Sequence, residues 1–309
     1  MSDVVISEFM DKETAEGLIA EYDVHWDPNL WDKRAELLEK MADARAIVVR
    51  NATQVNPELL DAAPNLKVVA RMGVGLDNID VEACKERGVD VCPSIGANAV
   101  SVAEYVITTA MVLLRGPAYF ATPEVAGGAW DRPKFAGARE IAGRTIGIVG
   151  FGSIGQVVGE KARGMGMNVI AYDAMMPDDH PAWTDARRVD LDDLIAEADV
   201  VTLHCPKLPQ TIDLIDARQF DRMKPEAVLV NSARGGIVNE AACAEALRAG
   251  KIAGAALDTL DVEPITPEVC KIFEGVPNLI LTPHIAGVTR ESNRRIAEVA
   301  AENVRRVLG

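Results

Sequence analysis

The chain has 309 residues, of which 49% are hydrophobic and 26% are charged. These proportions are typical of globular proteins and exclude a disordered or fibrous chain, and the length predicts about two domains. The formal net charge of −15 at pH 7 disfavours binding to nucleic acid or to an anionic membrane surface, because both would be repelled.

The cysteines and the apolar runs disfavour a metal-binding, disulfide-rich, secreted or membrane-spanning protein. The five cysteines are scattered and odd in number, and none has the spacing of a metal site or a disulfide framework, so we expect no bound metal. The N-terminal segment lacks the basic stretch of a signal peptide. The most apolar run, residues 102–114, contains Glu104 and is too short to span a bilayer. We therefore expect a soluble protein of the reducing cytoplasm.

In the first hundred residues, short apolar runs alternate with amphipathic, helix-like stretches. We predict strands at residues 4–6, 46–49, 67–70 and 89–91. The clearest helical patterns between them are at residues 31–42 and 81–87. Strands that alternate with helices favour a parallel sheet covered by helices on both faces.

The same alternation returns, more strongly, in the second half of the chain. A long helix is predicted at 99–114, followed by an irregular stretch at 115–143. The strands that follow are predicted at 145–149, 168–172, 200–203, 228–230, 253–257 and 279–281, with helices at 154–165, 240–249 and 292–307. Because the pattern occurs once in each half, we expect an α/β fold with two doubly wound, Rossmann-like domains.

A glycine-rich turn joins the strand at 145–149 to the helix that follows. Gly150, Gly152 and Gly155 have the GxGxxG spacing. The first glycine permits the tight turn, the second lets the backbone approach a pyrophosphate, and the third lets the helix pack on the strand. The helix N-terminus then offers unpaired N–H groups to the phosphates. A structural turn is the alternative, but the flanking strand and helix favour a dinucleotide site.

An acidic residue ends the next predicted strand. Asp173 lies where a carboxylate can accept hydrogen bonds from both ribose hydroxyls. The same carboxylate would repel a 2′-phosphate, and no arginine adjoins it. The sequence therefore predicts NAD rather than NADP.

One Arg, one Glu and one His follow successive predicted strands of the second half. They are Arg234, Glu263 and His284. The carboxyl ends of parallel strands meet at one edge of a sheet, so these side chains are expected beside the glycine turn. An Arg can grip a carboxylate at two points, a His can exchange a hydroxyl proton, and a Glu can orient the imidazole and favour its protonated form. Singly, each would be interpreted as surface charge or a structural histidine; together they predict an active site.

The order of these motifs resembles the D-isomer-specific 2-hydroxyacid dehydrogenase family over nearly the whole chain. The matching segments are residues 71–80, 98–104, 130–137, 150–155, 173, 204–206, 232–235, 257–264 and 282–287. The resemblance implies two similar α/β domains with the active site in the cleft between them. Residues 1–97 and 285–309 would form a flavodoxin-like substrate-binding domain, and residues 98–284 an NAD-binding Rossmann domain.

The resemblance also implies residue roles and a homodimeric assembly. Arg234 would anchor the substrate carboxylate, His284 would be the acid/base, and Glu263 would be the partner of His284. The residues that it assigns to the NAD site are Val74, Gly150, Gly152, Ser153, Ile154, Gly155, Asp173, Cys205, Pro206, Ser232, Ala233, Arg234, Asp258, His284, Ala286 and Gly287.

The remainder of the substrate is expected to meet the first domain. Backbone N–H groups near Val74 and Gly75 would help Arg234 and His284 to bind the carboxylate end. Arg50 and Arg71 each follow or end a predicted strand, so both could face the substrate. Two such cations in a protein of net charge −15 suggest a second anion on the substrate. The alternative is that each arginine forms a structural ion pair with a neighbouring acid.

Several small 2-hydroxy acids satisfy these expectations. The front half most resembles phosphoglycerate dehydrogenases, and residues 3–10 resemble the smaller sulfolactate dehydrogenase branch. One helix is predicted beyond His284, so we expect no regulatory extension. Our first choice is oxidation of (S)-3-sulfolactate to 3-sulfopyruvate. The (S) label applies because sulfur outranks oxygen and the D arrangement is kept. The alternatives are oxidation of 3-phosphoglycerate and reduction of glyoxylate or hydroxypyruvate.

A function of another class uses the same fold. NAD-sensing transcriptional corepressors keep the nucleotide site, and some keep the Arg, Glu and His set. No long disordered segment for partner docking flanks the domains here. The sequence therefore favours an enzyme over such a scaffold.

Overall fold

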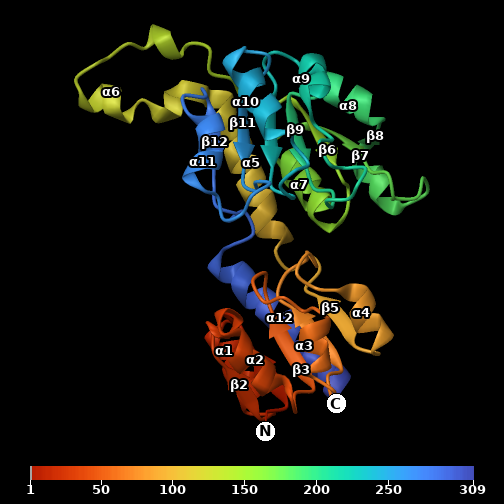
Figure 1. Ribbon diagram of the computed structural model, residues 1–309. Coiled ribbons are helices and arrows are strands. Elements are labelled where there is room, and N and C mark those ends of the chain that lie inside the picture. The colour runs from red at the N-terminus through yellow and green to blue at the C-terminus, as the bar shows by residue number, and fades with distance from the viewer. Residues whose placement is uncertain (1) are drawn as a thin grey trace. The chain divides into compact units, whose positions relative to one another are not determined.

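The computed structural model describes residues 2–309 and divides them into two compact units. Unit 1 comprises the residues up to Asn98 together with Val288–Gly309, and unit 2 comprises Ala99–Gly287. The chain thus changes units after residue 98 and again after residue 287, slightly later than the boundaries expected from the sequence. Each unit is an α/β layer structure (Figure 1).

The five strands of unit 1 are parallel and lie in the order β2-β1-β3-β4-β5. They are β1 (Val4–Ile6), β2 (Val24–Trp26), β3 (Ala46–Val49), β4 (Val68–Arg71) and β5 (Asp90–Pro93). The direction of winding changes between β1 and β3. Such a switch point is where doubly wound sheets bind ligands, at the carboxyl ends of the strands. Glu8, shortly after β1, and Arg50, directly after β3, lie at this edge.

Each face of the unit 1 sheet has its own core, because alternate residues of a strand point to opposite faces. Val4, Ile6 and Val48 pack with α1 and α12, and Val5 and Ile47 pack with the helices of the other face. In Figure 1, α12 at the C-terminus lies beside α1. The helices are α1 (Lys12–Ile19), α2 (Arg34–Met41), α3 (Pro57–Asp61), α4 (Val81–Glu86) and α12 (Arg290–Leu308), with the 3-10 turn η1 (Leu30–Asp32).

Unit 2 contains a seven-stranded parallel sheet in the order β12-β11-β10-β9-β6-β7-β8. Its strands are β6 (Thr145–Val149), β7 (Asn168–Tyr172), β8 (Arg187–Arg188), β9 (Val200–Leu203), β10 (Val228–Asn231), β11 (Gly254–Leu257) and β12 (Leu279–Leu281). The winding reverses between β6 and β9. Gly150 follows β6 and His204 follows β9, so the predicted nucleotide site lies at the switch point.

Helices cover both faces of this sheet as well. Ile146 and Ile148 pack on the face covered by α5 and α7, whereas Leu203 and Leu229 pack on the face covered by α8, α9 and α10. The helices are α5 (Ala99–Arg115), α6 (Thr122–Ala126), α7 (Ser153–Gly164), α8 (Leu191–Glu197), α9 (Ala217–Arg222), α10 (Glu240–Arg248) and α11 (Pro267–Cys270). The 3-10 turns are η2 (Gly116–Phe120), η3 (Pro133–Phe135), η4 (Pro181–Asp185) and η5 (Lys271–Phe273).

One helical stretch, Ala99–Ala126, is long and apolar enough to cross a membrane by length and composition. It is longer than the apolar run considered in the sequence, because η2 and α6 continue from α5 almost without a break. Most of its apolar part is buried, and α5 packs against α7, β10 and β11. Its apolar composition is therefore accounted for by its place in the core of unit 2.

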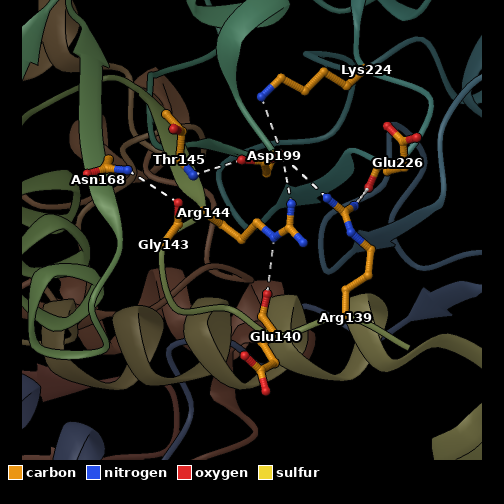
Figure 2. A network of polar contacts seen from close by, with 9 residues as sticks. All are labelled: Arg139, Glu140, Gly143, Arg144, Thr145, Asn168, Asp199, Lys224 and Glu226. Carbon is orange, nitrogen blue, oxygen red and sulfur yellow. Dashed lines mark hydrogen bonds and ion pairs between the residues drawn. The ribbon is translucent and has the colours of Figure 1, made fainter. Parts of the chain in front are cut away.

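A buried charge cluster closes the end of the unit 2 sheet that is opposite to the strand carboxyl ends (Figure 2). Asp199 directly precedes β9, and its side chain is 10% exposed. Its Oδ2 accepts the N–H of Thr145 at 2.9 Å, and its Oδ1 lies 3.4 Å from nitrogens of Arg139 and Lys224. Arg144 adds a fourth contact at 4.0 Å. The cluster joins the starts of β6 and β9 to the segment that precedes β6.

The structure differs from the sequence-based prediction at several elements. β2 and β8 were not predicted, because β2 is a half-buried edge strand and β8 consists of two exposed arginines, so neither is an apolar run. The helix expected at 31–42 begins only at Arg34, after a separate turn. The stretch at 115–143, expected to be irregular, contains α6 and two 3-10 turns.

We expect Asp199→Asn to lower the free energy of unfolding by about 2–3 kcal/mol, because three cations lose their common buried carboxylate. The substitution keeps an oxygen for the N–H of Thr145. The measurement is the urea unfolding transition. Asp192→Asn is the control, since Asp192 pairs with Arg218 and Arg222 at an exposed site where such pairs contribute about 1 kcal/mol or less. Equal losses in the two variants would contradict this assignment.

Candidate active site

The buried side chain of Asp258 organises the turn that carries His284. Asp258 follows β11 and is 1% exposed. Its Oδ1 accepts the N–H of Ile285 and its Oδ2 that of Ala286, both at 2.8 Å. The N–H of His284 itself donates to the carbonyl oxygen of Asp258 at 2.8 Å. These bonds hold His284 in a left-handed conformation, at φ 54°, which a residue with a side chain rarely adopts.

Two hydroxyl groups extend this arrangement to helix α5. The hydroxyl of Thr282 donates to Oδ1 of Asp258 at 2.6 Å. The hydroxyl oxygens of Tyr105 and Thr282 lie 2.7 Å apart. Because the single proton of Thr282 goes to the carboxylate, Tyr105 must be the donor in its bond to Thr282. Burial raises the pKa of Tyr105, so it keeps this proton at neutral pH.

His284 and Glu263 form the pair predicted from the sequence. Nδ1 of His284 lies 2.8 Å from Oε2 of Glu263. An ionised carboxylate can only accept, so Nδ1 carries the proton of this bond and Nε2 is left to exchange a proton with a ligand. The other oxygen of Glu263 accepts the N–H of Leu260 at 2.9 Å, which fixes the carboxylate from behind.

The loop that carries Glu263 is held from outside by two further charged residues. The N–H of Asp261 donates to Oε1 of Glu240 at 2.6 Å, and the Asp261 side chain pairs with Lys207 at 2.8 Å. Burial raises the pKa of Glu240, and the nearby carboxylates of Asp261 and Glu263 act in the same direction. Glu240 and Lys207 thus fix a loop whose only predicted role was to supply Glu263.

The turn of Arg234 is shaped by Asn231, the last residue of β10. The Asn231 side chain accepts the N–H of Ala233 at 3.1 Å and donates to the carbonyl of Arg234 at 3.0 Å. Nη1 of Arg234 donates to the carbonyl of Ala233 at 2.7 Å. Gly235 comes next. A Cβ placed on Gly235 would lie 1.9 Å from the carbonyl oxygen of Leu260, so only glycine lets this turn approach the Glu263 loop.

The glycine turn has the shape that a dinucleotide requires. A Cβ on Gly150 would meet the backbone of Cys205 at 2.7 Å, and one on Gly155 would meet the carbonyl of Gly150 at 2.3 Å. A Cβ on Gly152 would meet nothing within 4 Å, so the backbone there borders open space. The following helix, α7, has no side-chain cap on its first N–H groups. Ser153 and Ile154 begin this helix, and their N–H groups fit a pyrophosphate.

Asp173 is more fully occupied than its predicted role would suggest. Its carboxylate accepts three backbone N–H groups, from Phe151 at 2.8 Å, Met175 at 2.8 Å and Met176 at 3.0 Å. A carboxylate has about four lone-pair directions. One therefore remains for a ribose hydroxyl, whereas the sequence suggested room for two.

His204 and Cys205 follow β9, next to the glycine turn. His204 is half-buried, and the burial of its ring lowers its pKa to about 3, so the ring is neutral at physiological pH. Its Nε2 bonds with the hydroxyl of Thr202 at 2.9 Å. Burial raises the pKa of the Cys205 thiol to about 11. Neither residue adds a charge to the place where phosphates would lie.

In unit 1, Arg50 lies at the switch point between β1 and β3. Its guanidinium lies over the ring of Phe9, 5.8 Å from the centroid, and Nη2 donates to Oδ1 of Asn293 at 3.2 Å. Glu8 is near, but its carboxylate is used by the N–H groups of Arg50, Ala52 and Thr53. Burial lowers the pKa of Arg50, partly offset by the charge of Glu8. Across residues 2–309 the guanidinium makes no ion pair, so the structural alternative considered for Arg50 is not what the structure shows.

Arg71 ends β4, beside the strand that precedes Arg50. Val49 and Arg71 are partners in the sheet, so the two arginines leave neighbouring parallel strands at the same edge. Nη1 of Arg71 donates to the carbonyl of Met72 at 2.7 Å. This fold-back passes so close to Gly73 that a Cβ there would overlap Nη1 at 1.5 Å.

The predicted site residues fall into two groups, one in each unit. Arg50, Arg71, Val74 and Gly75 belong to unit 1. The remainder belong to unit 2, at or near the carboxyl ends of its strands; they are Gly150, Gly152, Ser153, Ile154, Gly155, Asp173, Cys205, Pro206, Ser232, Ala233, Arg234, Asp258, Glu263, His284, Ala286 and Gly287.

Comparison with known proteins identifies the family. The model of the NAD binding domain of D-isomer specific 2-hydroxyacid dehydrogenases matches residues 107–286. The (S)-sulfolactate dehydrogenase of Chromohalobacter salexigens is 48% identical over 100% of this chain and 99% of its own length. The chain belongs to the D-isomer-specific 2-hydroxyacid dehydrogenase family. It is therefore an oxidoreductase that uses NAD.

Two further comparisons, one with a relative and one with a solved structure, show the range of similarity. The D-3-phosphoglycerate dehydrogenase of Archaeoglobus fulgidus is 41% identical over 88% of this chain, which spans only 51% of that protein. A crystal structure of a protein from Thermus thermophilus superposes with a TM-score of 0.87 at 33% identity, covering 99% of this chain and 96% of the other.

Sequence reasoning missed five residues that shape this dehydrogenase site: Tyr105, Thr282, Asn231, Glu240 and Lys207. An Asn at a strand end that closes the next turn is a recurring local motif, so Asn231 could have been found. Thr282 lies two residues before His284 and could have been suspected for that reason. Tyr105 and Glu240 have no such signal, because each reaches the site from an element remote in the sequence.

We expect Gly235→Ala to lower turnover by roughly a hundredfold, because the Cβ would displace the loop that carries Glu263 and misplace the acid/base pair. The measurement is kcat with the preferred substrate. Gly164→Ala is the matched control: a Cβ at this last residue of α7 meets nothing within 4 Å. Near-normal turnover in Gly235→Ala would show that the loop adapts and that the close approach is not needed.

Proposed function

We propose that this protein catalyses the NAD-dependent oxidation of (S)-3-sulfolactate to 3-sulfopyruvate. The observation that carries the proposal is Arg50, a half-buried guanidinium at a strand-end switch point with no ion-pair partner within residues 2–309. The similarity to the (S)-sulfolactate dehydrogenase of Chromohalobacter salexigens, at 48% identity, supports the same substrate.

The cost of burying the Arg50 guanidinium favours a second anion on the substrate. Removing a guanidinium from water costs several kcal/mol unless a partner charge or strong hydrogen bonds compensate. Here the direct contacts of the guanidinium within the chain are one neutral amide and one aromatic ring, and the nearby charge of Glu8, which bonds to backbone N–H groups instead, offsets the burial only in part. An anionic substituent at C3 of the substrate would complete the site, with Arg71 on the neighbouring strand as the second cation.

Sulfonate and phosphate make similar demands on a pair of arginines, so the cations alone do not distinguish them. The choice of sulfonate rests on the relatives, because the sulfolactate dehydrogenase matches this chain over its full length at higher identity than the phosphoglycerate dehydrogenase does. Oxidation of 3-phosphoglycerate and reduction of glyoxylate or hydroxypyruvate are the outcomes against which the proposal is tested.

The proposed roles of the active-site residues follow from their bonds and chemistry. Arg234 and the N–H groups near Val74 and Gly75 hold the substrate carboxylate. Nε2 of His284 takes the hydroxyl proton, because Nδ1 is engaged by Glu263. NAD held at the glycine turn would supply the acceptor for the hydride from C2. In the reverse direction, protonated His284 returns the proton, and Glu263 stabilises the ring in that form.

We propose further that the protein is a cytoplasmic homodimer. Homodimers are usual in the family. In support, several large apolar side chains of residues 116–130 are exposed, among them Tyr119 at 62% and Trp130 at 78%. Exposed aromatic groups concentrated in one segment are typical of interface surfaces.

We expect the purified protein to reduce NAD with (S)-3-sulfolactate at a kcat/KM at least about tenfold above those for 3-phosphoglycerate and D-lactate. D-lactate lacks the second anion, and the expected preference over 3-phosphoglycerate rests on the similarity to the sulfolactate dehydrogenase. The measurement is NADH absorbance with each acid at equal concentration, together with reduction of sulfopyruvate, glyoxylate and hydroxypyruvate. Preference for 3-phosphoglycerate, for glyoxylate or for (R)-sulfolactate would overturn the assignment.

We expect His284→Ala to lower kcat by about 10²- to 10⁴-fold, the usual contribution of a positioned acid/base. NADH affinity should stay nearly unchanged, because the glycine turn and Asp173 are not altered. Turnover and NADH fluorescence titration measure the two effects. Near-normal turnover in the variant would refute the role of His284.

A further inference from the structure

The partner of Arg50 is an uncharged side chain on the C-terminal helix. Asn293 is the fourth residue of α12, and its Oδ1 accepts Nη2–H of Arg50 at 3.2 Å. A guanidinium can only donate, so the oxygen of the amide must face it and the amide nitrogen must face away. Within residues 2–309 the Nδ2–H₂ group of Asn293 donates to no other residue. Asn293 thus has an amide donor with no partner among these residues, beside a cation that forms no ion pair there.

Two arginines of α12 have carboxylate partners. On α12 itself, Arg294 pairs with Glu13 and Glu298, and Arg305 pairs with Glu21. Some arginine contacts of α12 thus include a carboxylate, whereas Arg50 faces an amide, as Arg306 does at Asn303. An aspartate in place of Asn293 would have nearly the same shape and would form an ion pair with Arg50.

We propose that Asn293 is a specificity-determining residue for 2-hydroxy acids that carry a second anion at C3. Its carbonyl oxygen holds the guanidinium of Arg50 in place without neutralising it. Its amide N–H₂ supplies a neutral donor to an oxygen of the bound sulfonate or phosphate. The inference rests on the proposed function, because it assumes that Arg50 binds the anionic end of the substrate.

The electrostatic consequence can be stated as a difference between two substrates. D-lactate has the same carboxylate and hydroxyl groups as sulfolactate but a methyl group in place of the sulfonate-bearing carbon. A carboxylate beside Arg50 would repel a sulfonate and compete for the guanidinium, whereas it would hardly affect D-lactate. Asn293 therefore acts on the choice of substrate and not on the chemical step.

The test is the pair of variants Asn293→Asp and Asn303→Asp. Asn303 lies on the same helix, and its Oδ1 accepts from Arg306 at 3.4 Å, so both variants place a carboxylate opposite an arginine of the same unit. An acidic residue in the first turn of α12 favours the helix dipole, so Asn293→Asp is not expected to unfold the protein. Thermal unfolding of both variants verifies this.

For Asn293→Asp we expect kcat/KM with sulfolactate to fall by about tenfold or more through KM, while kcat/KM with D-lactate changes by less than about twofold. Asn293→Ala lacks both the amide donor and the new charge. It should lower kcat/KM with sulfolactate by less than Asn293→Asp does, again with little change for D-lactate. Asn303→Asp should leave both substrates unaffected.

Different results would refute the proposed substrate preference and the proposed role of Asn293. If the wild-type enzyme does not prefer acids with an anionic C3 group over D-lactate, the proposed function fails, and the inference fails with it. If the wild-type enzyme shows this preference but Asn293→Asp retains it, or loses sulfolactate and D-lactate activity equally, the role of Asn293 is refuted and the proposed function stands. If the preferred acid is 3-phosphoglycerate, the same comparison with that substrate tests Asn293.

Discussion

The bonds to the buried carboxylate of Asp258 hold together the part of unit 2 on which the proposed proton transfer depends. Three donors converge on this side chain: the hydroxyl of Thr282 and the N–H groups of Ile285 and Ala286. A solvent-exposed carboxylate could not enforce a left-handed His284, because water would compete for each bond. Burial at 1% exposure removes that competition. The direction of the His284 ring is then set by Glu263, whose loop is fixed independently.

The strands and the three proposed catalytic residues could be predicted because both leave local signals. Buried parallel strands are continuous apolar runs, so residues 4–6, 46–49, 145–149 and 200–203 coincide with strands of the structure. Arg234, Glu263 and His284 are polar residues that follow such runs closely. Parallel topology then places them at one edge of the sheet. The bond between His284 and Glu263 confirms that expectation for this pair.

The parts that escaped prediction depend on contacts between distant segments. Arg50 and Asn293 are 243 residues apart in the sequence, and nothing near Arg50 indicates that its partner would be neutral. Tyr105 reaches Thr282 across 177 residues. The carboxylate of Asp173 accepts three backbone N–H groups of nearby loops. The path of a loop backbone is not indicated by the pattern of side chains, so these bonds could not be predicted. β8 is a strand because its backbone pairs with β7 at the edge of the sheet, and its own residue composition does not predict it.

The protonated state of Cys205 lowers the reactivity of its thiol toward oxidants and electrophiles. With a pKa of about 11, its thiol is ionised in only about one molecule in ten thousand at pH 7. Peroxides and electrophiles attack the thiolate, so this cysteine reacts slowly although it lies beside the glycine turn. A thiolate at this position would be open to oxidation. The half-buried Cys205 is thereby held in the less reactive thiol form.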